Sequence, residues 1–84
     1  MEQFETGMMA RSKSGHDAGK VYVITKVEEA YVYLVDGKVR TLDKPKKKKK
    51  KHVQLIKESF DIQGATDMDI KRWIKIWNKE DNQN

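Results

Sequence analysis

Two consecutive runs of β-branched and aromatic residues constrain the fold of this 84-residue chain more than any other feature. The runs cover residues 21–27 (VYVITKV) and 31–35 (YVYLV), and only three residues separate them. Such side chains are enriched in strands, and a connection this short joins antiparallel neighbours. We therefore predict a β-rich fold built around this pair of strands.

Three further short strands are expected around this pair. Residues 4–9 alternate weakly, and a loop rich in Gly, Ser and Asp follows over residues 10–20. Asp36-Gly37 is a strong signal for a two-residue type I′ turn, which predicts a returning strand over residues 38–42. Residues 52–56 form the last expected strand. Five short strands with tight turns favour a small barrel.

The Asp36-Gly37 turn also fixes which side chains share a face, because successive residues of a strand alternate. The predicted core face carries Val32, Leu34, Val39 and Thr41. The opposite face carries Tyr31, Tyr33, Lys38 and Arg40. We expect the second face to be exposed, since it combines aromatic rings with cations as nucleic-acid surfaces do. Simple cross-strand packing of the two tyrosines remains an alternative.

The C-terminal part predicts an amphipathic helix over residues 66–79. Thr66 is a favourable N-cap, and Asp69 three residues later completes an acidic variant of the capping box. An apolar stripe with helical spacing follows, and we expect it to pack on the barrel because a helix this short is marginal alone. The chain thus divides into a barrel with a basic loop (residues 1–57) and a linker with this helix (residues 58–84). The stripe consists of Ile70, Trp73, Ile74 and Trp77.

The positive charge of the chain is concentrated in its middle. The net charge is +5, yet residues 38–57 alone hold ten basic residues and one acid. Such a segment attracts polyanions. A run of like charge is often only solvated, but here the run 46–51 stands between two predicted strands, as a loop inside the fold. Lysine suits phosphate contacts better than bidentate base reading.

The sequence offers no constellation for catalysis, a cofactor or a metal. Cysteine is absent, and His16 and His52 have no partner at metal-ligand spacing. Residues 15–20 (GHDAGK) are one residue too short for a nucleotide-binding loop, and a strand follows instead of a helix. We therefore predict a protein that is not an enzyme and that needs no cofactor.

The composition also bears on location. No apolar stretch approaches the roughly 18 residues of a membrane span. The absence of cysteine favours a reducing compartment, and the N-terminus is acidic, unlike a signal peptide. We expect a cytoplasmic protein without a membrane partner.

Several segments, in order, resemble the KOW-domain RNA-binding proteins. They are residues 12–21 (SKSGHDAGKV), 36–40 (DGKVR), 42–48 (LDKPKKK) and His52. The similarity is greatest to a short bacterial branch related to a large-subunit ribosomal protein of archaea and eukaryotes, and it covers about residues 3–57. Gly19-Lys20-Val21 corresponds to the centre of the KOW motif. The resemblance implies an SH3-like β-barrel that binds structured RNA, foremost ribosomal RNA.

From these observations we predict a non-enzymatic RNA-binding protein and assign roles to its residues. Gly15 and Gly19 let the first loop turn tightly and let RNA approach. The expected ribose or base contacts come from Tyr31, Tyr33 and Arg40. The expected contacts to the phosphate backbone come from Arg11, Lys13, Lys20, Lys38, Lys44, Lys46, Lys47, Lys48, Lys49, Lys50 and Lys51, with His52 beside them.

Other functions stay open at this point. The fold class also includes peptide-binding modules, and the apolar stripe of the helix would then dock on a partner. A basic segment alone does not distinguish RNA from DNA, and Pro45 followed by six lysines satisfies a nuclear import receptor. If the target is ribosomal RNA, the sequence is equally compatible with a permanent ribosomal subunit and with an accessory factor. We expect a monomer when free, with a ribosomal protein as a further potential partner.

Overall fold

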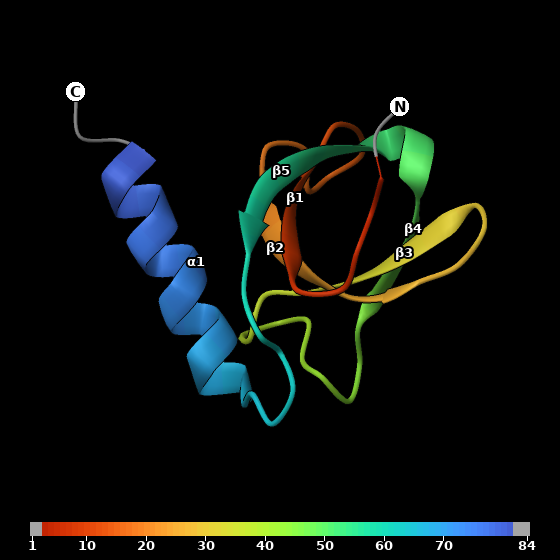
Figure 1. Cartoon of the computed structure of the whole chain (residues 1–84). Helices are drawn as coiled ribbons and strands as arrows, with labels where there is room; N and C mark the ends of the chain where they lie inside the picture. Colours follow the sequence, from red (N-terminus) through yellow and green to blue (C-terminus); the bar gives the residue numbers. More distant parts are fainter. Residues whose placement is uncertain (1–2, 82–84) are drawn as a thin grey trace.

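The computed structural model describes residues 3–81, which form a mainly β fold with a C-terminal helix (Figure 1). The 3-10 helix η1 (Lys50–His52) joins the fourth strand directly to the fifth, and the α-helix α1 (Asp67–Asp81) ends the described chain. The strands are β1 (Met8–Ser12), β2 (Val21–Val27), β3 (Tyr31–Val35), β4 (Lys46–Lys49) and β5 (Val53–Ser59).

The five strands form one antiparallel sheet in the order β4-β3-β2-β1-β5. Strands β4 and β5 are its two edges, so within the described chain the sheet is not closed as a barrel. It is nevertheless strongly curled, and helix α1 lies outside the curl (Figure 1). The predicted number of strands is confirmed, and the sheet that they form is open.

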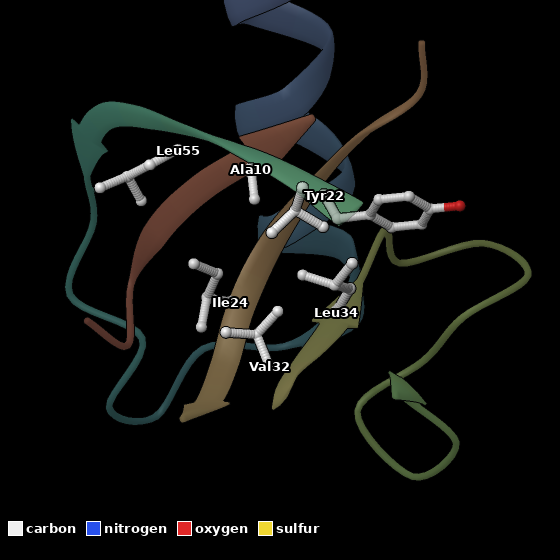
Figure 2. Close-up of a cluster of buried hydrophobic side chains, with 7 residues drawn as sticks. Ala10, Tyr22, Ile24, Val32, Leu34 and Leu55 are labelled. Carbon is white, nitrogen blue, oxygen red and sulfur yellow. The ribbon is translucent and has the colours of Figure 1, made fainter. Parts of the chain in front are cut away.

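One hydrophobic cluster fills the side toward which the sheet curls (Figure 2). Its members alternate along each strand, as the pleat requires. Ile24, Val32 and Leu34 are fully buried, which confirms the predicted core face of strand β3. The Tyr22 ring belongs to this cluster while its hydroxyl points away from the apolar side chains (Figure 2). The cluster consists of Ala10, Tyr22, Ile24, Val32, Leu34, Val53 and Leu55.

A second cluster lies on the opposite side of the sheet and is covered by helix α1. Ile70 is fully buried in it, a burial that contributes roughly 2 kcal/mol. The Trp73 ring stacks on Phe60, with centroids 4.7 Å apart. The apolar stripe therefore packs on its own sheet, as expected. The cluster consists of Met9, Val21, Val23, Val35 and Ile70, with Trp73, Ile74 and Trp77 packed against it.

Helix α1 begins with the predicted capping box. The Thr66 hydroxyl accepts a hydrogen bond from the Asp69 N–H at 3.2 Å, and the Asp69 carboxylate accepts one from the Thr66 N–H at 3.0 Å. These bonds satisfy N–H groups that every helix start leaves without partners. They also hold the pKa of Asp69 below its ordinary value, the bond from the Thr66 backbone having the largest effect.

The strand predicted over residues 38–42 is wrong, because these residues form a loop. A type I′ turn needs positive φ at both central residues, and here only Gly37 has it, with φ of +81°. The Asp36 carboxylate instead accepts hydrogen bonds from the N–H groups of Lys38 and Arg40, at 2.8 and 2.9 Å. This loop leaves Val39 77% exposed, so its predicted core position is also wrong.

The lysine run is not the predicted loop but strand β4 followed by helix η1. Strand β4 supplies the antiparallel partner of β3 that residues 38–42 were expected to supply. The other predicted strands fare better. Residues 21–27 and 31–35 match at both ends, the first strand lies later than predicted, at residues 8–12, and the last extends from 53 to 59.

No helix within residues 3–81 has the length and apolar character needed to cross a bilayer.

Candidate nucleic-acid interface

The pairing of strands β3 and β4 places tyrosines and lysines on one face of the sheet. Tyr31 lies opposite Lys49, and Tyr33 lies opposite Lys47. Residues directly opposite in an antiparallel pair point to the same side, so the four side chains lie on the side of the strand pair opposite to Val32 and Leu34 of the first cluster. The Lys47 ammonium lies 4.4 Å from the Tyr31 ring centroid and 5.9 Å from that of Tyr33.

A bulge in strand β2 adds Lys26 to this face. The register between β2 and β3 shifts between Ile24 and Lys26, so that Ile24 pairs with Leu34 and Lys26 pairs with Tyr33. Without this bulge, regular alternation would place Lys26 on the same side as Ile24, toward the core. The Lys26 ammonium instead lies 5.2 Å from the Tyr33 ring centroid.

The edge of this face carries more positive than negative charge. Glu28 is its main counter-charge, at 3.7 Å from the Lys26 ammonium and 4.0 Å from that of Lys47. Both pairs are substantially exposed, so each contributes little. Beyond them a shallow hollow of about 470 Å³ is lined by Glu29, Ala30, Tyr31, Lys49, Lys50 and Lys51. We call Lys26, Tyr31, Tyr33, Lys47 and Lys49, together with this hollow, the tyrosine–lysine face.

Alternation along strand β4 sends two other lysines to the opposite side, toward Asp17. The ammonium groups of Lys46 and Lys48 each lie 2.9 Å from the Asp17 carboxylate. Lys48 also donates to the Ser14 carbonyl at 2.8 Å, and its side chain is only 10% exposed. These two lysines hold the first loop to strand β4. They are therefore engaged within the fold and are not counted among the phosphate contacts.

Asp17 is the centre of this network and is 6% exposed. Its carboxylate also accepts hydrogen bonds from the Ser12 hydroxyl at 2.9 Å and the Tyr22 hydroxyl at 3.0 Å. Burial alone raises the pKa of Asp17, but the hydrogen bonds from Lys48, Lys46, Ser12 and Tyr22 outweigh it and hold the pKa far below its ordinary value. Burial and the hydrogen bond to Asp17 raise the pKa of Tyr22 to about 12.

The first loop adopts the tight path expected of its glycines. Gly15 and Gly19 have φ of +87° and +92°, a region that residues with a side chain rarely adopt. Hydrogen bonds from the Gly19 N–H to the Ser12 carbonyl and from the Ser12 N–H to the Lys20 carbonyl close the base of the loop. This geometry brings Asp17 into contact with Lys46 and Lys48 of strand β4.

The remaining predicted contacts do not gather on the tyrosine–lysine face. The Arg11 guanidinium lies over the Trp77 ring of helix α1, 5.4 Å from its centroid. Lys20 and Lys38 line a separate groove beside helix α1. The others lie in the first loop (Lys13), in the loop after β3 (Arg40 and Lys44) and in η1 (His52).

The sequence did not single out two residues that shape this region, Asp17 and Lys26. Asp17 was seen only as a breaker within a loop, and its partners are distant along the chain. Lys26 was seen only as a strand residue, and the register shift that exposes it beside Tyr33 leaves no local sequence signal. The one sequence signal for Asp17 is its position as a polar residue between two turn-forming glycines.

Within the described part of the chain, no cluster of His, Asp or Glu side chains is suited to hold a metal ion. No family model matches the chain, and no curated protein is significantly similar to it.

Proposed function

We propose that this chain is a non-enzymatic RNA-binding module that uses the tyrosine–lysine face. The observation that carries the proposal is the pairing of Tyr31 with Lys49 and of Tyr33 with Lys47 on an accessible sheet surface. Unpaired bases stack on aromatic side chains, and lysines neutralise the neighbouring phosphates. The stacking tyrosines and the phosphate-binding lysines lie within one strand pair, so one short RNA segment reaches both.

The strand connections support an SH3-like assignment of the KOW type. Strand β1 pairs with both β2 and β5, and the chain passes from β4 to β5 through η1. The sheet curls around one apolar cluster. The resemblance of residues 12–52 to KOW proteins points in the same direction. On this basis we propose structured ribosomal RNA as the target, and a cytoplasmic, ribosome-associated role.

Binding to a labelled RNA, measured by fluorescence anisotropy, tests this proposal. The probe is a hairpin of ribosomal RNA with an unpaired loop. Replacing both tyrosines of the face by alanine should weaken binding about tenfold or more, because each lost stacking contact costs roughly 1–3 kcal/mol. Lys47→Gln with Lys49→Gln should weaken it severalfold, and Lys57→Gln with Lys79→Gln is the control with equal loss of charge.

The salt dependence gives a second readout. Five lysines belong to the tyrosine–lysine face, so log K should fall against log salt with a slope of roughly −3 to −4. Equal effects of the face variants and of the control variants would contradict the proposed interface. Equal affinity for the matching DNA hairpin would favour a general nucleic-acid binder. Crosslinking to RNA in cells, followed by sequencing, tests the ribosomal target, and recovery of messenger RNA alone would contradict it.

A further inference from the structure

A groove separate from the tyrosine–lysine face runs between helix α1 and the loop after strand β3. It has a volume of about 710 Å³, and four lysines line it. Lys20 and Lys38 come from the sheet side, and Lys71 and Lys75 from the helix. All four are exposed. Among the side chains that the structure describes, none of the four forms an ion pair.

The lining of the groove also includes apolar side chains, together with Asp36 and Asn78. Val39 is 77% exposed beside it, the largest exposed fraction among the large hydrophobic residues of the described chain. Ile74 adds a half-buried aliphatic side chain from helix α1. None of the described residues that line the groove is aromatic. The site therefore lacks the stacking surface that unpaired bases use, but it offers an aliphatic floor between two rows of cations.

The walls of the groove are fixed to each other. The Leu42 N–H donates to the Asp67 carboxylate at 2.8 Å, which ties the loop to the start of helix α1. Gly37 lies against the backbone of Asp67 and Lys71 so closely that it leaves no room for a Cβ. Ile70, fully buried, anchors the same helical turn on the sheet. A ligand therefore meets a site that is already formed, which lowers the entropic cost of binding.

We propose that this groove binds an acidic peptide segment of a partner protein, with an aliphatic side chain of that segment on Val39 and Ile74. Carboxylates on both sides of the aliphatic anchor then face Lys20 and Lys38 on one wall and Lys71 and Lys75 on the other. Charge complementarity selects an acidic segment, and the aliphatic floor selects against a nucleic-acid strand. The site is independent of the RNA-binding proposal, since the two surfaces share no residue.

Peptide binding to the full chain tests this inference. The probe is a fluorescein-labelled peptide of about twelve residues in which two leucines are flanked by glutamates. Lys38→Glu with Lys75→Glu should weaken its binding about tenfold or more, since two attractions become repulsions. The matched control is Lys44→Glu with Lys79→Glu, which makes the same charge change on the same loop and helix outside the groove, and it should change affinity less than threefold.

Two further measurements separate the alternatives. Serine in place of the peptide leucines, or Val39→Ser in the protein, should also weaken binding severalfold if the aliphatic floor takes part. In amide NMR spectra the peptide should shift Val39 and Lys75 and leave Tyr33 unchanged. The proposal is overturned if the peptide shows no binding near 1 mM, if both double variants weaken it equally, or if an RNA hairpin rather than the peptide shifts the groove residues.

Discussion

The carboxylate of Asp17 lies 2.9 Å from the ammonium group of Lys48, although 31 residues separate the two along the chain. This contact joins the first loop to an edge strand made only of lysines. A strand of four lysines has low intrinsic β propensity and strong self-repulsion. Asp17 offsets part of that repulsion and faces a second ammonium group, that of Lys46, at the same distance. The network therefore explains how a lysine run becomes a strand.

Asp17→Asn should destabilise the fold by about 2–4 kcal/mol. The substitution removes the charge that compensates two partly buried ammonium groups, and the loss of one partner of a buried ion pair is costly. Lys46 keeps some access to water, with 27% of its side chain exposed. We therefore expect a smaller loss of stability than for a fully buried ion pair. Urea unfolding measures the change. Asp43→Asn, at an exposed position, should stay within about 0.5 kcal/mol of the parent.

The Asp17 network should make stability sensitive to acid. In the unfolded chain this carboxyl titrates near its ordinary pKa of 3.8, while in the folded state its pKa is far lower. The stabilisation is therefore complete above the unfolded-state value and is lost as pH falls through it toward the folded-state value. The difference in unfolding free energy between the parent and Asp17→Asn, measured between about pH 2.5 and 7, should narrow toward the acidic end. A difference that stays constant with pH would contradict this linkage.

Tyr22 should ionise only at a pH well above the ordinary pKa of a tyrosine. Its pKa is raised to about 12 by burial first and then by its hydrogen bond to the Asp17 carboxylate. An ultraviolet absorbance titration of the phenolate, with circular dichroism to monitor folding, should show one step well above pH 11. Tyr22→Phe should remove that step, whereas Tyr31→Phe should leave it in place. Because the folded-state pKa is raised, this group stabilises the fold below pH 10 and the contribution is lost as pH rises further.

The part of the fold that the sequence predicted rests on local patterns. Residues 21–27 and 31–35 are rich in β-branched and aromatic side chains, so both strands were identified with correct ends. The capping box of Thr66 and Asp69 and the stripe of helix α1 are equally local. Each of these features depends on residues that lie close together in the sequence.

The parts that were missed depend on partners far along the chain. A lysine run has no alternation from which a strand can be read, and strand β4 forms because β3 pairs with it and Asp17 meets two of its side chains. The tyrosine face was expected to carry Lys38 and Arg40, and it carries Lys47 and Lys49 instead. The chemical character of that face was thus anticipated, but the residues that supply its charge were not.

Gly37 marks the point where the local turn signal and the tertiary fold diverge. Its Asp-Gly context favours a hairpin, yet the glycine is needed for another reason: a Cβ there would collide with the Asp67 carbonyl oxygen and lie 2.9 Å from the Lys71 nitrogen. Gly64 has nearly the same φ, +79° against +81°, but open space around the Cβ position.

Alanine at these two glycines separates backbone strain from collision. Gly64→Ala should cost about 1 kcal/mol, the penalty of a left-handed conformation alone. Gly37→Ala carries the same penalty and must also push the loop away from helix α1, so we expect roughly 2 kcal/mol more in urea unfolding. Because the collision is with the wall of the lysine-lined groove, Gly37→Ala should also weaken the acidic peptide severalfold under conditions where the protein stays folded. Equal costs for the two variants would show that the loop and the helix do not pack as closely as described.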